Sequence, residues 1–402
     1  MPLTFSAVYR SVKLPGKAVM SLLIRNTVVA SPSGPHRADI LVQGPRIVAV
    51  GRDLEAPGAE ILDAEGLTAG PGFIDVHVHG GGGRTFFSDD PAEVAAYAAW
   101  APSRGVTAFL VSTVGPDAAA TAARLSALRP AIQPLPGSAE PLGFHLEGPF
   151  LNPIRRGAFP AHYLREPSIA EYETFHEAAG GLVRQVTVAP ELPGALPLIH
   201  TIARLGAVPA LGHTDATVPE CRHGFEAGIA HVTHLFNAMR PIHQREGGPV
   251  VAALEAPDVT CELICDGAHV EPAVLRLAYR LLGPLRTVIV TDNLHLAGVD
   301  AGQAVFAGEE ITVSGAHARK ADGTIVGSVA TFDVHFRNAV EIFGLDLPAA
   351  FRLASTNPAR VAGVADRKGQ LEPGFDADIV LLDHDLRVAA TVCRGEVAYR
   401  RA

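Results

Sequence analysis

The sequence has few cysteines, no excess of basic residues and no long apolar run, and each absence narrows the class of protein. Its four cysteines, Cys221, Cys261, Cys265 and Cys393, form no Cys-X-X-Cys pair, which argues against a disulfide framework and fits a reducing compartment such as the cytoplasm. No run reaches the roughly 18 apolar residues of a membrane-spanning helix. With a formal net charge of −9, the chain is not expected to bind nucleic acid or a membrane surface.

The length and composition suit one large domain and a smaller one. The 402 residues are 48% hydrophobic and 19% charged, which is ordinary for a globular protein with a large core. Forty glycines and 31 prolines are dispersed among apolar runs, a pattern typical of many tight turns. Residues 1–19 carry cations without the continuous apolar centre of a signal peptide. They are predicted to be a disordered extension, or a misassigned start ahead of Met20.

Short strands are predicted at both ends of the chain. Residues 20–69 contain four short apolar runs punctuated by glycine and proline, and residues 358–402 contain three more. Each set is too small to stand alone, and chain termini often lie close together. The two segments are therefore predicted to form one small β-sandwich domain.

Between these segments, residues 70–357 alternate apolar runs with helical stretches. The runs are rich in Val, Ile, Leu and Thr, as strands buried on both faces are, and they cover residues 73–79, 107–113, 143–148, 185–190, 208–214, 231–236, 260–267 and 287–292. Eight strand–helix units predict an α/β fold, a (β/α)8 TIM barrel. A β-hairpin insertion is predicted near residues 305–327.

Polar side chains cluster at the ends of these predicted strands. Four histidines and two acids share this position, namely His77, His79, Glu147, His213, His234 and Asp292. The C-terminal ends of barrel strands face one mouth, where active sites are built. Each residue alone would more often be structural, but six such groups buried together without a partner would be costly. Imidazole and carboxylate are ligands for Zn²⁺ or Fe²⁺, so one or two divalent ions are predicted, with Glu147 able to bridge two.

Two neighbouring features of the sequence also have simpler interpretations. Asp292 is predicted to act as an acid/base beside the metal, which lowers the pKa of a bound water to about 7; the alternative is a cap of a helix or turn. The four glycines at residues 80–83 lack the Lys-Ser/Thr of a phosphate-binding P-loop. They are predicted to form a tight loop beside the metal site.

Several motifs resemble those of the amidohydrolase superfamily. PGFIDVHVHG at residues 71–80 resembles its opening motif, and GFDADIV at residues 374–380 resembles its closing strand. Four further stretches resemble the N-acetylglucosamine-6-phosphate deacetylase family within it, namely HLEGPFLNP at 145–153, GHT at 212–214, THLFNAM at 233–239 and DGAHV at 266–270. The resemblance covers nearly everything from Met20 onward.

The resemblance implies a reaction and a role for each site residue. It implies hydrolysis of N-acetyl-D-glucosamine 6-phosphate to glucosamine 6-phosphate and acetate, a step of amino-sugar catabolism. Glu147, His213 and His234 would be the main metal ligands. His77 and His79 match the members that hold a second ion. Asp292 would be the catalytic acid/base, and His269 would polarise the acetamide carbonyl.

The resemblance also implies the substrate contacts. These would come from Ala158, Phe159, Asn237, Ala238, Arg245, Asp266, His269, Ile325, Val326 and Gly327. Arg245 would hold the phosphate of the small-molecule substrate by reaching in from a neighbouring subunit, which implies a homodimer. Of the other nearby arginines, Arg155, Arg156 and Arg240, none is assigned a role.

Two departures from the family pattern leave the substrate open. Phe159 stands where the family usually has a substrate-binding histidine, and His295 follows Asp292 where small residues are usual; His295 could replace the missing donor. Another N-acyl-hexosamine phosphate, such as N-acetylgalactosamine 6-phosphate, is therefore an alternative substrate. A different amidohydrolase, such as a cyclic-amide hydrolase, is a second alternative, but the fourth predicted strand, residues 185–190, lacks the lysine that many of those enzymes need. A non-catalytic scaffold is a third, although no predicted ligand is missing.

Overall fold

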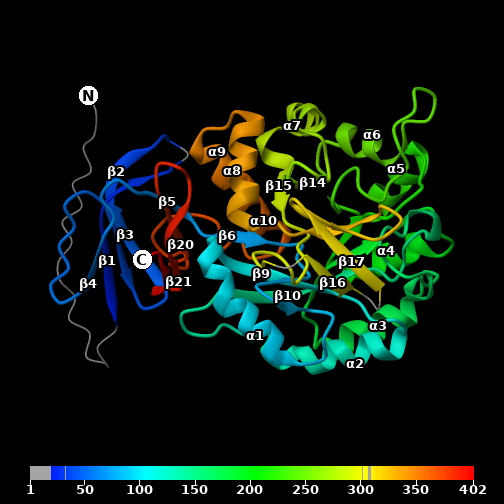
Figure 1. Ribbon diagram of the computed structural model, residues 1–402, viewed down its shortest axis with the longest axis horizontal. Helices are drawn as coiled ribbons and strands as arrows, with labels where there is room; N and C mark the ends of the chain where they lie inside the picture. Colours follow the sequence, from blue (N-terminus) through cyan, green and yellow to red (C-terminus); the bar gives the residue numbers. More distant parts are fainter. Residues whose placement is uncertain (1–19, 32, 301, 307–308) are drawn as a thin grey trace.

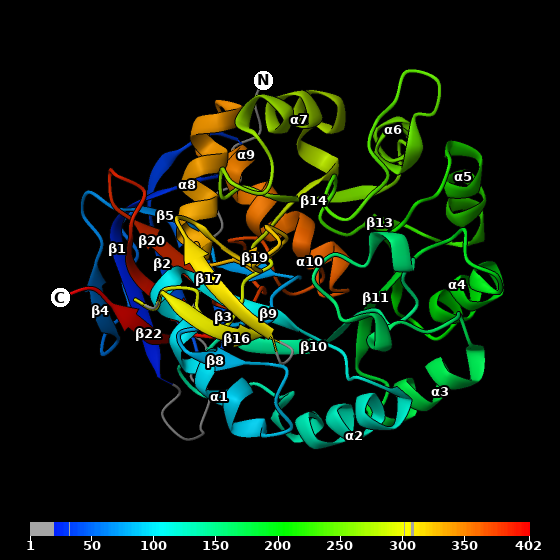
Figure 2. The same cartoon turned by 45° about the vertical axis from the view of Figure 1, so that its right-hand side comes forward.

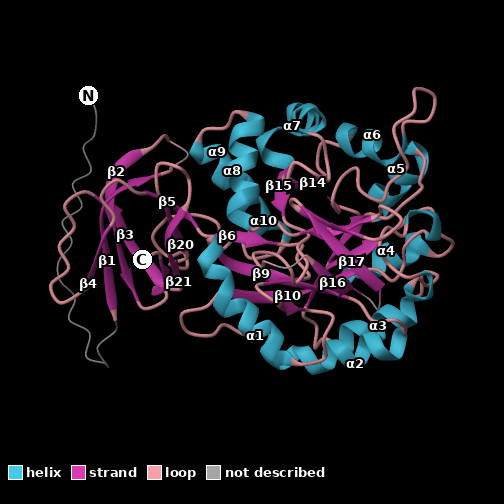
Figure 3. Ribbon diagram, viewed as in Figure 1, coloured by secondary structure: helices cyan, strands magenta, loops and turns pink. Residues whose placement is uncertain are grey.

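The computed structural model describes residues 20–31, 33–300, 302–306 and 309–402, so the extension predicted at residues 1–19 lies outside them. This part of the chain forms a small body made of strands and a larger body in which helices surround strands (Figures 1 and 3). None of its helices is long and apolar enough to cross a membrane.

The small body takes its strands from both ends of the chain. They are β1 (Ser21–Val29), β2 (His36–Gln43), β3 (Arg46–Gly51), β4 (Glu60–Asp63), β5 (Thr68–Pro71), β20 (Ile379–Leu382), β21 (Val388–Cys393) and β22 (Glu396–Arg400). The predicted joining of the two ends is confirmed, because β20 pairs antiparallel with β5, which pairs with β1. Hydrogen bonds link all eight strands into one sheet. Ile24, Ile40 and Leu381 share one apolar core. One continuous sheet therefore provides the core that two separate sheets would form in a sandwich.

The predicted barrel of eight strands is confirmed. The strands are β6 (Phe73–Asp75), β9 (Val106–Thr113), β10 (Glu140–Glu147), β11 (Val183–Val188), β12 (Val208–Leu211), β13 (His231–Val232), β14 (Thr260–Ile264) and β15 (Thr287–Val290), and each pairs in parallel with its neighbour in the sheet. Two backbone hydrogen bonds just beyond β6 and β15 bring the ends of the sheet together. The N–H of Asp292 donates to the carbonyl of His77, and that of His79 to the carbonyl of Asn293, both at 2.9 Å.

Eight helices follow the barrel strands and lie round the outside of the barrel (Figure 2). They are α1 (Pro91–Trp100), α2 (Ala118–Leu128), α3 (Ile169–Ala178), α4 (Ala195–Arg204), α5 (Val218–Ala227), α6 (Gly248–Glu255), α7 (Pro272–Arg286) and α8 (Phe332–Phe343). Local sequence sets where they begin. At α5, for example, the side chain of Thr217 accepts from the N–H of Glu220, and the Glu220 carboxylate accepts from that of Thr217, a capping box that satisfies free donors of the first turn.

Two loops beside the barrel mouth differ in how well the sequence predicted them. The glycine loop is a tight turn in which β7 (Gly80–Gly81) pairs with β8 (Arg84–Thr85). The insertion near residues 305–327 has four antiparallel strands where one hairpin was predicted: β16 (Gln303–Phe306), β17 (Glu309–Ser314), β18 (His317–Arg319) and β19 (Ile325–Ser328). The last strand returns to the barrel, since the N–H of Ser328 donates to the carbonyl of Asp292 at 3.0 Å.

A helical segment leads from the barrel back to the small body. It comprises α9 (Leu347–Phe351), a π-helical turn (Arg352–Thr356) and α10 (Asn357–Val361). The ring of Phe351 packs against Phe336 and Phe73, with centroid distances of 5.0 and 6.0 Å. Phe73 begins the first barrel strand, so this segment is packed directly against the base of the strand that leads to His77 and His79.

Candidate metal centre and substrate cavity

The predicted metal ligands converge around the carboxylate of Glu147. Its Oε2 lies 2.9 Å from Nε2 of His79, and its Oε1 lies 3.1 and 2.9 Å from Nε2 of His213 and His234. Nε2 of His77 is 3.4 Å from Oε1. The cluster falls into two groups that share Glu147, one with His77, His79 and Asp292 and one with His213 and His234. The barrel thus gathers residues that lie up to 215 positions apart in the sequence, from five of its strands and the turns that follow them.

The backbone at three of these residues is strained. His213, His234 and Asp292 have φ values of 47°, 27° and 51°, in the left-handed region that side chains other than glycine rarely adopt. Each follows the end of a barrel strand, where the chain turns sharply. Strain of this kind costs on the order of 1–3 kcal/mol per residue and persists only where the surrounding structure imposes it, commonly at functional sites.

Hydrogen bonds fix which nitrogen of each ring faces the cluster. Nδ1 of His79 lies 3.0 Å from the carbonyl of Ser112, and Nδ1 of His213 lies 2.8 Å from the carbonyl of Arg155. A carbonyl only accepts, so Nδ1 carries the hydrogen and the Nε2 lone pair points towards Glu147 when the ring is neutral. This is the arrangement of metal-binding histidines, whose other nitrogen is held by a carbonyl or carboxylate.

A buried carboxylate that the sequence analysis missed supports the cluster from below. Oε2 of Glu262 lies 2.8 Å from Nδ1 of His77 and accepts from the backbone N–H of His234 at 2.9 Å. Its Oε1 accepts from Gln185 and lies 3.0 Å from Nε2 of His231. Glu262 sits inside β14, in an otherwise apolar run. The sequence feature that could have identified it is an acidic residue at an inward-facing position of a buried strand.

The cluster fits a divalent cation by two independent observations. Nε2 of His77, which faces Glu147 and Asp292 at 3.4 and 3.5 Å, is buried and lacks a hydrogen-bond partner among the described residues. Burial lowers the pKa of His79, but hydrogen bonds to Asp292 and Glu147 outweigh it and raise that pKa to about 9. The carboxylates therefore draw positive charge into the cluster. A divalent ion supplies that charge while leaving the imidazoles neutral.

A cavity of about 260 Å³ opens directly above the cluster. Its lining includes His79, Glu147, His213 and Asp292, and on its walls Ala158, Phe159, Asn237, Ala238, His269, Ile325 and Val326. Most of the predicted site residues therefore meet in one place, although the sequence places them on different elements. Thr324 and Phe306 from the insertion line the cavity too, although no motif in the sequence points to them.

The side chain of His269 is oriented by a neighbouring acid. Oδ2 of Asp266 accepts from Nδ1 of His269 at 2.6 Å, while its Oδ1 accepts from the backbone N–H groups of Ala268 and His269. Burial alone would raise the pKa of Asp266, but the contacts with His269 lower it well below its ordinary value. Asp266 thus lies behind His269 rather than on the cavity wall, and Nε2 is the ring nitrogen left for a ligand.

Four other predicted site residues lie outside this cavity. Arg245 is exposed on the loop between β13 and α6 and does not line the cavity of its own chain. Gly327 lies beside it, where a Cβ would come within 2.8 Å of the Asp292 carbonyl. His77 and His234 are buried beneath it.

Phe159 and His295, the two residues that depart from the family pattern, lie in different cavities. Phe159 is 6% exposed, and its ring meets that of His213 with centroids 5.6 Å apart at 60°. His295 instead lines a neighbouring cavity of about 360 Å³, which shares Phe306 with the first. The structure therefore does not bring His295 to the position of the missing donor, and the wall at Phe159 is apolar.

Known proteins match the chain over most of its length. A model of the amidohydrolase family matches residues 68–398. The N-acetylglucosamine-6-phosphate deacetylase of Bacillus subtilis (strain 168) is 33% identical over 351 residues, 87% of each chain. The N-acetylgalactosamine-6-phosphate deacetylase of Escherichia coli O157:H7 is 36% identical over 336 residues, 84% of this chain and 88% of that one.

A solved structure matches the fold as closely. It is a mutant of N-acetyl-D-glucosamine-6-phosphate deacetylase from Mycobacterium smegmatis in complex with N-acetyl-D-glucosamine-6-phosphate. It is 36% identical, with a TM-score of 0.87, and the match covers 95% of this chain and 99% of that one.

Proposed function

Because the chain belongs to the amidohydrolase family, we propose that it hydrolyses the acetamide of N-acetylglucosamine 6-phosphate to glucosamine 6-phosphate and acetate. The observation that carries this function is the composition of the 260 Å³ cavity, whose floor holds the shared carboxylate Glu147 with Asp292 beside it and whose wall holds His269. The deacetylases from Bacillus subtilis and Mycobacterium smegmatis support the reaction class.

The histidines and Glu147 would hold the metal. Glu147, His213 and His234 form one ligand set, and His77 with His79 would extend it to a second ion. Zn²⁺ and Fe²⁺ are the metals we favour for this mixture of imidazole and carboxylate. A metal bound there would polarise the carbonyl and lower the pKa of water. The test is removal by a chelator, which should abolish activity, followed by reconstitution with each metal and a count of ions per chain.

Asp292 would move the proton that the reaction requires. It would accept a proton from the attacking water and return it to the nitrogen of the departing amine, so that acetic acid and the free amine form without net change of charge on the enzyme. The acid then loses its proton to the solvent and leaves as acetate. His269, which donates its Nδ1–H to Asp266, would in its protonated form also donate an Nε2–H to the acetamide oxygen, where negative charge develops. The apolar ring of Phe159 would keep bulk water from that side of the cavity.

The direct test is acetate release by the metal-loaded protein from three sugars. They are N-acetylglucosamine 6-phosphate, its galactosamine epimer and unphosphorylated N-acetylglucosamine. Strong turnover of the first, with little of the others, supports the proposal. Turnover of the epimer alone would support a second candidate, which the Escherichia coli relative and the apolar Phe159 favour. Activity on none of the three would overturn both.

We further propose that the enzyme is a cytoplasmic homodimer in which Arg245 binds the substrate phosphate of the neighbouring subunit. Arg245 is exposed and outside its own cavity, and the four cysteines are free and buried, as a reducing compartment allows. The test mixes Arg245→Ala and Asp292→Asn subunits, each inactive alone. A two-fold dimer then regains about one quarter of the activity, because each mixed dimer has one complete site. No recovery in dimers shown to be mixed would mean that Arg245 serves its own chain.

A further inference from the structure

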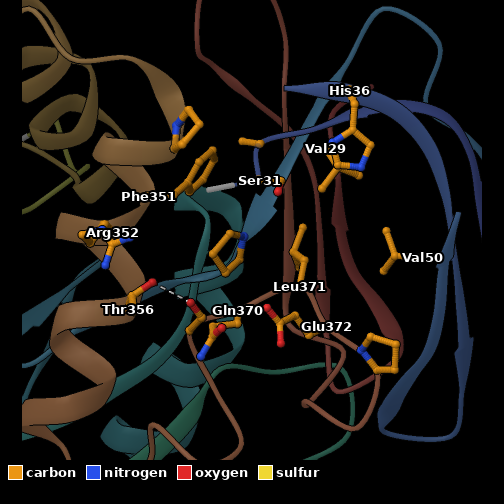
Figure 4. A pocket seen from close by; sticks show the side chains of 15 residues that line it. Val29, Ser31, His36, Val50, Phe351, Arg352, Thr356, Gln370, Leu371 and Glu372 are labelled. Atoms are coloured by element: carbon orange, nitrogen blue, oxygen red, sulfur yellow. Dashed lines mark hydrogen bonds between the residues drawn. The ribbon is translucent and has the colours of Figure 1, made fainter. Parts of the chain in front are cut away.

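A second cavity lies at the seam between the small sheet body and the barrel. Its volume is about 410 Å³, and no residue of its lining belongs to the substrate cavity. Figure 4 shows Arg352 and Thr356 on the barrel side, His36 and Val50 on the sheet side, and the loop with Leu371 between them. This seam cavity is thus a separate space, walled by the π-helical turn and by residues 369–373.

Polar groups without partners line the seam cavity. Arg352 is partly buried and lines the cavity, yet within the described ranges no hydrogen bond reaches its guanidinium and no carboxylate lies within ion-pair distance. The side-chain amide of Gln370 also has no hydrogen-bond partner there. By contrast, Arg367 and Lys368, just before this loop, are each paired with acids. An arginine in a concave site that its own chain leaves unpaired is a ready partner for an anion.

The backbone of the same loop adds further donors. Residues 369–372 are four successive lining residues, and none of their N–H groups donates to an acceptor in the part of the chain that the structure describes. Runs of free N–H groups on a concave surface are a common way to bind anions. One acid, Glu372, is among the lining residues. Its side chain is exposed, so water screens its charge, and Arg352 is the only arginine or lysine of the described lining.

We propose that the seam cavity binds a small phosphate monoester, with the phosphate held by Arg352, the Gln370 amide and the N–H groups of residues 369–372. A guanidinium forms paired hydrogen bonds with phosphate oxygens, and a cavity of this size can hold one sugar phosphate. The apolar side chains of Val50 and Leu371 would face the carbon skeleton. The inference stands apart from the proposed deacetylation, because it uses none of the residues of that site.

The seam cavity is also connected to the substrate cavity by packing. Phe351 lines it, and a Cβ at Gly70 would come within 2.1 Å of the Phe351 ring. The same ring packs on Phe73, from which β6 runs to His77. A ligand at the seam therefore lies against the segment that positions the first metal ligands.

Calorimetric titration of the intact, metal-loaded protein with inorganic phosphate and with glucosamine 6-phosphate tests the proposal. Besides any binding in the substrate cavity, wild-type protein should show a second binding event that Arg352→Gln weakens at least tenfold, because hydrogen bonds to charged groups are lost. Arg276→Gln is the matched control, since Arg276 is an exposed helical arginine that likewise has no hydrogen-bond or ion-pair partner among the described residues. It should titrate like wild type. Tighter binding of the sugar phosphate would identify the esterified ligand, and equal binding would identify free phosphate.

A second variant keeps the test decisive if Arg352→Gln unfolds. Gln370→Glu places a carboxylate beside Arg352 and should abolish the same binding event while the melting temperature stays at or above that of wild type. Acetate release without added phosphate should be unchanged in both variants, so failure of the proposed reaction would be seen separately. Binding curves that coincide for wild type, Arg352→Gln and Gln370→Glu would overturn the proposal.

Discussion

Nδ1 of His77 lies 2.8 Å from Oε2 of Glu262, and neither side chain has any solvent exposure. The ionised carboxylate can only accept, so Nδ1 carries the hydrogen and Nε2 is the nitrogen directed to the cluster. Burial alone would raise the pKa of Glu262, but the charge of His77 and the hydrogen bonds from His231 and His77 lower it well below its ordinary value. Since the same carboxylate also holds the backbone of His234, one buried acid positions ligands of both groups.

Replacement of this acid should weaken metal binding. Glu262→Gln keeps the size of the side chain but removes the charge that orients His77, so the affinity for metal should fall roughly 10- to 100-fold. Competition with a chromophoric chelator measures it. The exposed Glu341→Gln is the control and should bind metal normally. Equal affinities of the two variants would mean that Glu262 is only a packing residue.

Replacement of the proposed acid/base should separate chemistry from metal binding. Asp292→Asn should keep its metal content but lose roughly 10²- to 10⁴-fold in kcat, because the amide cannot take up and return a proton. Metal analysis and acetate release on the same sample measure both. Asp366→Asn, at an exposed position, should leave both unchanged. Near-normal turnover by Asp292→Asn would refute the assigned role.

The apolar wall at Phe159 should set the affinity for the sugar. Phe159→His restores a hydrogen-bond donor, which contributes about 1 kcal/mol, so KM should fall about fivefold for the sugar that it contacts while kcat changes little. Phe159→Leu keeps the wall apolar and should not lower KM. Steady-state kinetics on both hexosamine epimers measure the effect. If KM rises for both epimers, the ring makes a contact that the donor cannot replace.

A buried ion-pair network should make the fold acid-sensitive. Oε1 of Glu140 lies 2.7 Å from Arg367, and Oε2 lies 2.8 Å from Lys368. Burial alone would raise the pKa of Glu140, but these contacts lower it to about 2. Because the folded-state pKa lies below the unfolded one, the stabilisation is complete above about pH 5 and is lost as the pH falls towards 2.

Urea unfolding across this range checks the effect. At neutral pH, Glu140→Gln should lower the free energy of unfolding by about 3 kcal/mol relative to wild type. The difference should shrink steadily as the pH falls from 5 to 3. The exposed Glu226→Gln should follow wild type at every pH. A difference that is independent of pH would show that packing, and not charge, accounts for the loss.

The sequence by itself determined the barrel and most of the metal cluster. Apolar runs separated by helices specify parallel strands buried on both faces, and in such a barrel every strand ends at the same mouth. Residues such as His79, Glu147 and His213 could therefore be grouped without knowing a single distance. Their positions at the ends of predicted strands were enough to group them, because the geometry of the fold brings these strand ends together.

Only the tertiary structure decided which residues support that cluster and which face the substrate. Glu262 is a single acidic residue in a mostly apolar strand, and its contact with His77 joins residues 185 positions apart. This contact forms only when the barrel closes, so no local sequence pattern predicts it. For the same reason His295, next in sequence to the site, lies in another cavity, and Arg352 shares the seam with residues of the opposite end of the chain. The spacing of residues in the sequence determines which side of a strand each side chain faces. Contacts across the barrel depend instead on how all the strands pair to close the barrel.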